Sequence, residues 1–237
     1  MVKIYRCQLE LHDSLYFATR ELGRLYETEP IIHNYALSYV LGLVDSEKFA
    51  TTVEDEAYSY RYFCGEQIPR YQEQLTPLNR QGIYVTPARA VQHTSVLNTW
   101  KYADNRYHVE MQPTERNIPS FGRTKEISAE SVFEFLVVSE KEITFSRWVR
   151  IGKWASKAEL TVQTLEKIKH NAEKPFVCSH PLNPLDVMFT NQVLSYDTIN
   201  MPPVSLIHNV SMKGAYYTTA EMPELKLPIH MRYHFGE

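Results

Sequence analysis

The sequence predicts an α+β fold, and three features of its residue pattern lead to that prediction. Residues 3–12 alternate apolar and polar side chains, which is the period of a half-buried strand. Residues 30–44 repeat apolar side chains at helical spacing behind an opening proline. Segments after residue 130 are rich in β-branched and aromatic residues. A strand, a helix and then more strands predict a ferredoxin-like first lobe followed by a β-rich part.

The first strand and the helix each have one apolar side. In the strand every second residue is apolar, and these residues are Tyr5, Cys7, Leu9 and Leu11. In the helix apolar residues recur every three or four positions, and they are Ile31, Ile32, Tyr35, Ala36, Tyr39, Val40 and Leu43. Pro30 is at the expected start, where its missing amide hydrogen is not needed. Both segments therefore predict elements with one buried side.

A second strand-like pattern follows in the segment AYSYRYF, with Tyr58, Tyr60 and Tyr62 on one side. A row of tyrosines in a sheet packs against a helix in many proteins, and it stacks bases in RNA-binding sheets. Both roles stay open. The chain from 66 to 125 is then polar and irregular, with short β-like pieces at GIYVT and near NTWKYA. We expect a stretch of that length to be a functional excursion from the core.

Three segments after residue 130 extend the β prediction. SVFEFLVVS, at 131–139, is apolar on both sides, which is typical of a central strand. ITFSRWVRI, at 143–151, alternates, and Gly152 is expected to end it. Its inward residues are Ile143, Phe145, Val149 and Ile151, and its outward residues are Trp148 and Arg150. Residues 156–170 combine the spacing of a helix cap with the β-branched run LTVQT, so their structure stays open.

Composition and length narrow the class of protein. The chain has 237 residues, a net charge of −3 and no apolar run near the roughly 20 residues that span a bilayer. Its first residues lack the apolar core of a secretory signal, and its three scattered cysteines fit neither a disulfide framework nor a zinc site. We therefore expect a reducing cytoplasm. No phosphate-binding glycine loop or paired metal-ligand motif is present, and Asp186 is interpreted as an isolated turn residue, so we expect no metal and no cofactor.

One basic segment differs from the rest of this mildly acidic chain. RWVRIGKWASK, residues 147–157, has four cations, two tryptophans and no acid. Cations neutralise phosphates and exposed tryptophans stack on bases, so the combination suits single-stranded nucleic acid. In the alternative, the tryptophans belong to the core and the cations only reach out to water. The residues alone do not separate the two interpretations.

Three segments of the chain resemble a known protein family. They are TRELGRLYETEPIIHNYAL at 19–37, RIGKWASKAEL at 150–160 and HPLNPLDV at 180–187. The chain is similar there to Csc-one, the Cas-five-type subunit of the type I-D CRISPR Cascade complex, and the resemblance runs from the first strand to at least Asp186. This group is similar to the RAMP superfamily, which has an RRM-like ferredoxin fold with a protruding thumb. The resemblance therefore implies a RAMP-type fold and a place in a ribonucleoprotein complex for antiviral defence.

The resemblance also implies a function and partners. Such a subunit is expected to cap the five-prime handle of the guide RNA (crRNA) and to nucleate assembly. It would pack against the backbone subunit and the large subunit, near the protospacer-adjacent motif (PAM) of the target DNA. The implied division is a ferredoxin-like lobe over 1–140, with a thumb at 66–125, and a β-rich lobe over 141–237. The glycine-rich loop typical of RAMP proteins is not visible, since Gly152 and Gly214 stand alone, and no loop contact to RNA is assigned.

The candidate contacts to nucleic acid fall into three groups. Those of the basic segment are Arg147, Arg150, Lys153, Trp154 and Lys157. Trp154 is preferred to Trp148, which lies inside the expected strand. Arg20 and Arg24, on the expected loop after the first strand, either hold a phosphate or pair with nearby glutamates. The candidates in the thumb are Arg89, Lys101, Arg106, Arg116, Arg123 and Lys125, for which a solvated loop is the alternative.

Catalysis is the main alternative to simple RNA binding. Metal-independent RNA cleavage needs a base near the ribose 2′-OH, an acid for the leaving oxygen and a cation for the phosphate, which are roles for His, Tyr and Lys. His33 and Tyr35 near the helix start are the best-placed pair, and His12 is next. A histidine in a first helical turn is more often structural, and the resemblance implies a separate processing enzyme. We therefore expect a non-catalytic subunit, with an endoribonuclease that processes pre-crRNA and a purely structural adaptor as alternatives.

Overall fold

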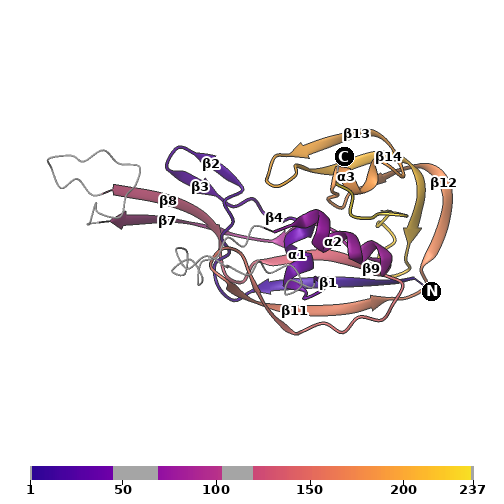
Figure 1. The fold of residues 1–237 in the computed structure, drawn as a ribbon, viewed down its shortest axis with the longest axis horizontal. Helices are drawn as coiled ribbons and strands as arrows, with labels where there is room; N and C mark the ends of the chain where they lie inside the picture. Colours follow the sequence, from indigo (N-terminus) through magenta and orange to yellow (C-terminus); the bar gives the residue numbers. More distant parts are fainter. Residues whose placement is uncertain (1, 45–68, 103–119, 236–237) are drawn as a thin grey trace, which may run out of the picture.

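The structure is a computed structural model that describes residues 2–44, 69–102 and 120–235. Within these residues the chain forms three β-sheets and three short helices (Figure 1). The fold is mixed α and β but mostly sheet. Two sheets make the body of the molecule, and the third extends away from it as a narrow arm. None of the described helices is long and apolar enough to cross a membrane.

The first sheet is built around β1 (Lys3–Leu11), which lies between β9 (Val132–Ser139) and β11 (Ser156–Leu165). The outer strands are β10 (Trp148–Ile151), β6 (Ala88–Gln92), β5 (Ile83–Val85) and β4 (Ile31–Ile32). The described pairs in this sheet are antiparallel. Two predictions are confirmed here, since β1 alternates buried and open residues and β9 is mostly buried on both sides. The unsettled segment after residue 156 begins with a strand, β11.

Two helices cover one face of the first sheet, and they are α1 (Asn34–Val40) and α2 (Tyr71–Arg80). Their buried leucines meet Tyr5, Cys7 and Leu9 of β1 in the main hydrophobic core. The intervening residues of β1 point to the opposite side of the sheet, because side chains alternate along a strand. We call this side the open face, and it carries Arg6, Gln8 and Glu10 of β1. Its Ile4 end is not open, because a separate buried cluster with leucines of the C-terminal segment covers it.

Helix α1 confirms the prediction of a helix but not its predicted bounds of 30–44. Ile31 and Ile32 form β4 instead and pair with β6. Their β-branched side chains favour a strand. His33 then caps the helix, because its Nδ1 accepts a hydrogen bond from the Tyr35 amide at 3.2 Å. The helix ends early, two residues before a glycine with left-handed backbone.

The last third of the chain forms the second sheet. Its strands are β12 (Lys169–Cys178), β13 (Gln192–Ile199), β14 (Leu206–Thr218) and β15 (Leu227–Pro228), and α3 (Pro184–Val187) packs with them. The chain passes from the first sheet to the second between Leu165 and Lys169, since β10 and β11 still pair within the first sheet. The sheets therefore do not divide at residue 140. The division into lobes of 1–140 and 141–237 stays a prediction.

A buried polar network joins α3 to the first sheet. Asp186 accepts hydrogen bonds from Asn34 Nδ2 at 2.8 Å and from Tyr84 Oη at 2.9 Å. The His234 amide donates to its other oxygen at 3.1 Å. Burial raises the pKa of the Asp186 carboxyl to about 7, although these hydrogen bonds oppose the rise. The interpretation of Asp186 as an isolated turn residue is wrong, because the residue is buried at the centre of this network.

The third sheet forms the arm in Figure 1. Its strands are β2 (Arg20–Leu22), β3 (Leu25–Glu27), β7 (Ser95–Tyr102) and β8 (Ser120–Ile127). The β-like pieces expected at GIYVT and near NTWKYA are confirmed by β5 and β7. The expectation that the rest of 66–125 is irregular is wrong for its described part, since α2 and β6 belong to the body and β8 pairs with β7 in a hairpin. Residues 20–27, expected as a loop, join this hairpin through β3. The predicted strand with Tyr58, Tyr60 and Tyr62 lies outside the described residues.

Candidate nucleic-acid interface

The basic segment 147–157 lies at one edge of the first sheet, where β10, a tight turn and the start of β11 follow one another. Trp148 and Arg150 are exposed and alternate with buried residues, as predicted. Gly152 ends the strand, also as predicted, but the strand begins at Trp148 and not at the predicted residue 143. The φ of 80° at Gly152 favours glycine, and an added Cβ would lie 2.7 Å from Leu15 Cδ1. The local sequence therefore determines the shape of this edge.

Trp148 is the centre of the first part of this segment. The residue is 42% exposed, and Lys157 Nζ lies 4.0 Å from its ring centroid. The His12 ring meets the indole edge-on at 5.0 Å, and the Arg147 guanidinium carbon lies 5.6 Å from the ring centroid. We call these four residues the Trp148 cluster. A cation held against an exposed indole places charge and a flat apolar surface together, which suits phosphates and bases at once.

Acidic residues from outside the segment reduce its positive charge. Arg147 Nε donates a hydrogen bond to Glu159 Oε1 at 2.7 Å, and Arg150 Nη1 lies 3.9 Å from Asp13 Oδ2. Exposed ion pairs of this kind contribute little free energy, but their carboxylates compete with other anions for the arginines. Within the described part of the chain, the Lys157 ammonium has no acidic partner. Lys157 is therefore the cation of the cluster that is most available to a phosphate.

Trp154 lies in the turn after β10 and connects the body to the arm. It is 45% exposed, and its ring centroid lies 4.6 Å from that of Tyr16 and 5.5 Å from that of Trp100 on β7. The amide of Lys153 donates to the Tyr16 carbonyl oxygen at 2.9 Å. The expected contrast, in which Trp148 packs and Trp154 is open, is not found, because the two are almost equally exposed. Trp154 packs against two aromatic rings, whereas Trp148 lies against two cations and the edge of the His12 ring.

A pocket of about 290 Å³ beside Lys153 contains the alternative catalytic pair, His33 and Tyr35. Both ring nitrogens of His33 are in use, since Nδ1 accepts from the Tyr35 amide and Nε2 lies 3.2 Å from the Val204 carbonyl oxygen. Burial lowers the pKa of His33 to about 4 and raises the pKa of Tyr35. A general base needs a ring nitrogen within reach of the substrate. This geometry favours a structural role for His33.

The arm contains other predicted contacts, and two of its cations are paired with acids. Arg20 Nη2 lies 2.7 Å from Glu27 Oε2 and 2.8 Å from Glu29 Oε1. Lys125 Nζ lies 3.4 Å from Glu27 Oε1. The alternative in which Arg20 stabilises this part of the chain through ion pairs is therefore what the structure shows. A contact of Arg20 or Lys125 with RNA stays a prediction.

The remaining candidates are only partly brought together. Arg24, expected on the loop after the first strand, lies between β2 and β3, and the amide of the thumb candidate Arg123 on β8 donates to the Arg24 carbonyl oxygen at 2.8 Å. Lys101 lies on β7. Arg89 is not in the arm but on β6 of the first sheet, where it pairs with Glu134. Arg106 and Arg116 lie outside the described residues.

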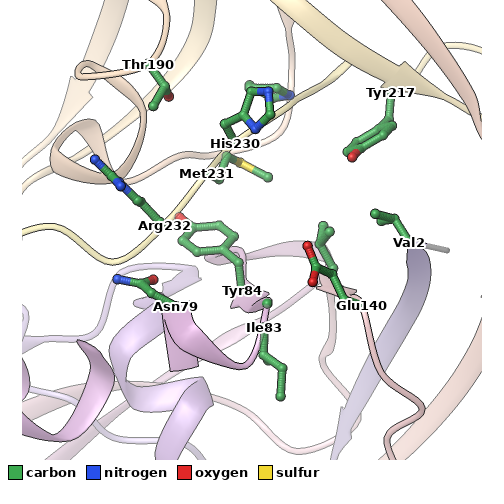
Figure 2. A pocket seen from close by; sticks show the side chains of 13 residues that line it. Val2, Asn79, Ile83, Tyr84, Glu140, Thr190, Tyr217, His230, Met231 and Arg232 are labelled. Carbon is green, nitrogen blue, oxygen red and sulfur yellow. The ribbon is translucent and has the colours of Figure 1, made fainter. Parts of the chain in front are cut away.

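A second pocket, of about 420 Å³, lies at the opposite end of β1 from Trp148. Figure 2 shows Glu140 and Arg232 on opposite sides of it, with Val2 and Tyr217 nearby. One acid and one arginine leave this pocket without the excess positive charge that a polyanion needs. Among the described residues, no group of three His, Cys, Asp or Glu residues is arranged to hold a metal ion.

Sequence reasoning missed the residues that other elements bring to the basic segment. They are Asp13 and Tyr16 after β1, Trp100 on β7 and Glu159 on β11. The one local signal was Glu159, which is the second residue after the segment and is opposite Trp148 once β10 and β11 form a hairpin. The other three depend on how β1 and the arm meet this edge.

These features define a mostly β protein with an open sheet face that carries cations and an exposed tryptophan, and with a projecting arm. The model of the family described as Type I-D CRISPR-associated protein Cas5/Csc1 matches residues 2–236. The chain therefore belongs to this family of CRISPR effector subunits. In a cryo-EM structure of the Type III-B Cmr-beta complex bound to cognate target RNA and AMPPnP, one chain is similar with a TM-score of 0.44 and 8% identity, over 88% of this chain and 86% of that one. No curated protein matches the sequence.

Proposed function

We propose that the chain is a non-catalytic RNA-binding subunit of a type I-D CRISPR effector complex and caps the five-prime handle of the crRNA. In this role it nucleates assembly, contacts the backbone subunit and the large subunit, and lies near the PAM end of the target DNA. The family match over residues 2–236 supports its place in such a complex. A single-stranded handle needs a surface that binds phosphates and bases together.

The observation that carries the proposal is the Lys157 ammonium, 4.0 Å from the centroid of the exposed Trp148 ring. A base stacked on an exposed aromatic ring contributes about 1–3 kcal/mol, whatever its identity. The ammonium beside the ring can neutralise the phosphate of the same or the next nucleotide. An adaptor that binds an acidic protein could use the same cation and ring, because tryptophan is also common in protein interfaces. RNA binding itself therefore has to be measured to separate the two.

The strand order of the first sheet supports an RRM-like lobe. If β1, β6, β9 and β11 are numbered one to four in chain order, their order across the sheet is four, one, three, two, and α1 comes between strands one and two in the chain. The ferredoxin-like fold has this order, and RNA-binding members use the sheet face that the helices leave open. The segment between β9 and β11 contains β10 where that fold has its second helix. We propose that the arm is the thumb.

The test uses the full chain, alone and within the assembled complex. Repeat RNA is incubated without divalent metal, and both cleavage and the dissociation constant are measured over a range of salt concentrations. We expect uncleaved RNA that salt releases steeply, because phosphate contacts displace counterions. Trp148→Ala should weaken binding. Arg70→Gln, which removes an exposed arginine at the start of α2, is the control and should not.

Two other results would replace the proposal. Metal-independent cleavage that His33→Ala abolishes, in a variant that still folds, would establish the endoribonuclease. Failure of both the free chain and the assembled complex to bind repeat RNA would leave the structural adaptor.

A further inference from the structure

Three adjacent strands of the first sheet bring two arginines and a glutamate together on the open face. Arg6 Nε of β1 donates a hydrogen bond to Glu134 Oε2 of β9 at 2.6 Å, and Arg6 Nη2 forms an ion pair with the same oxygen at 2.5 Å. Arg89 of β6 donates from Nη2 to Glu134 Oε1 at 3.0 Å. Each carboxylate oxygen is therefore held by a different arginine. We call Arg6 and Arg89 the arginine pair.

The glutamate is covered, whereas the arginine pair is not. The Glu134 side chain is 2% exposed, and those of Arg6 and Arg89 are 33% and 39% exposed. Burial raises the pKa of Glu134, but the hydrogen bonds and charges of both arginines outweigh this and lower the pKa below its ordinary value. The carboxylate is therefore ionised at neutral pH. Two guanidiniums and one carboxylate leave a net positive charge, and the guanidiniums are the groups that solvent reaches.

Both guanidiniums keep hydrogen-bond donors that Glu134 does not use. A guanidinium has five N–H donors in a rigid fork. In the part of the chain that the structure describes, Glu134 is the sole hydrogen-bond and ion-pair partner of the Arg6 and Arg89 side chains. The buried Glu134 carboxylate thus holds both guanidinium groups in place, while some of their N–H donors stay unused. This arrangement reduces the entropy that is lost when a further anion binds.

We propose that the arginine pair binds a phosphodiester group of the RNA strand that stacks on Trp148. Phosphate is the favoured anion because the planar fork of arginine matches two of its oxygens with parallel N–H bonds. Glu134 is a positioning residue that orients both forks and does not touch the RNA. The inference rests on the proposed function and adds to it a phosphate site in the middle of the sheet.

The distance between the pair and Trp148 suits a single strand that crosses the open face. Trp148 is opposite Glu159 of β11, and Glu159 is opposite Glu10 of β1. Arg6 lies four residues before Glu10, with Gln8 on the same face between them. Neighbouring strands are about 4.8 Å apart and residues rise about 3.3 Å along a strand, so the backbone positions of Trp148 and Arg6 are about 16 Å apart. An RNA segment of a few nucleotides spans that distance.

The test compares Arg89→Gln and Arg6→Gln with the control Arg70→Gln, whose arginine pairs with Glu73 on α2. Each full-length variant is titrated with repeat RNA at several salt concentrations, and thermal unfolding is measured on the same samples. Arg89→Gln is the cleaner variant, because Arg6 still neutralises Glu134. We expect the slope of log K against log salt to become shallower by about 0.7 for each phosphate that the variant no longer neutralises. Arg70→Gln should keep the wild-type slope.

A second measurement identifies the phosphate. RNAs that carry one methylphosphonate, which removes the charge of a single phosphate, are tested at every position. We expect one position to weaken binding by the wild-type chain and to lose this effect in Arg89→Gln. If Arg6→Gln and Arg89→Gln bind with the wild-type slope and the wild-type methylphosphonate pattern, the pair is structural and the inference is wrong, while the proposed function stands. If the wild-type chain and complex do not bind the RNA, both are wrong.

Discussion

The two faces of the first sheet use their polar and aromatic residues for different purposes. On the helix-covered face, His33 and Asp186 are buried and hold α1 and α3 in place with their hydrogen bonds. On the open face, Trp148 is exposed and the Lys157 ammonium lies against its ring. A buried polar group must be satisfied by the protein itself, whereas an exposed group can exchange water for a ligand. The first face therefore contributes to stability, and the part of the second face around Trp148 and Lys157 is available for binding.

The largest expected effect is on the helix-covered face, where burial raises the pKa of Asp186 to about 7 from its ordinary 3.8. An acid with a raised folded-state pKa destabilises the fold when it is ionised, above about pH 7. That cost disappears as the pH falls from about 7 to about 4. Asp186→Asn has no such titration. We therefore expect the unfolding free energy of wild type, relative to the variant, to rise by about 3–4 kcal/mol from pH 8 to pH 4.

Denaturant titrations at several pH values measure this difference. RNA affinity at neutral pH is the control, and Asp186→Asn should leave it unchanged because the residue is far from solvent. A stability difference between wild type and variant that stays constant across the pH range would contradict the raised pKa of the buried Asp186 carboxyl.

The next effect is on the open face. Trp148→Ala should weaken repeat-RNA binding by about 1–3 kcal/mol, because it removes the stacking surface. Thermal stability should change little, since the ring is 42% exposed. Trp148→Phe keeps an aromatic ring and should retain part of the affinity. Fluorescence anisotropy with labelled RNA measures the change, and wild-type affinity in Trp148→Ala would place the binding surface elsewhere.

Trp154→Ala provides the matched comparison on the same segment. Its ring contacts Tyr16 and Trp100, so its removal should lower the free energy of unfolding by about 1 kcal/mol. RNA affinity should fall less than in Trp148→Ala. The reverse pattern, with weakened affinity and unchanged stability, would move the centre of binding from the Trp148 cluster to the junction with the arm.

The smallest expected effect comes from removing an acid. Glu159→Gln frees Arg147, which is paired with it at 2.7 Å, and should strengthen RNA binding by about 0.5 kcal/mol at low salt. Screening should abolish the gain near 1 M salt, where the Debye length is about 3 Å. Glu142→Gln is the control, because it breaks an exposed ion pair with Lys3 at the other end of β1. Equal gains in both variants would show a net-charge effect only.

Sequence patterns predicted the elements whose burial follows from local alternation. The period of two in β1, the apolar run of β9 and the outward side of Trp148 were all visible, because side chains on a strand alternate whatever its neighbours are. The patterns did not predict the bounds of α1, because the pairing of Ile31 and Ile32 with β6 competes with helical propensity. Long-range packing also put most of the described part of 66–125 into regular elements.

The candidate site was predicted in part. The basic segment was found from its composition, and its exposure agrees with the binding interpretation. The sequence pattern predicts Arg89 in the thumb, but the structure has it on β6 of the first sheet, paired with Glu134. His33 was the best catalytic candidate, but its ring nitrogens are used within the fold. The partners Glu134 and Val204 come from distant parts of the chain, which no local pattern contains.

By itself the sequence determined the family resemblance, the two central strands and the sides on which the residues of β10 lie. Only the tertiary structure decided that Asp13 and Glu159 reduce the charge of the basic segment, that Asp186 is enclosed and that the arginine pair shares one acid. The physical reason is distance along the chain. Alternation acts between neighbouring residues, whereas Arg6 and Glu134 are 128 positions apart and meet only through strand register.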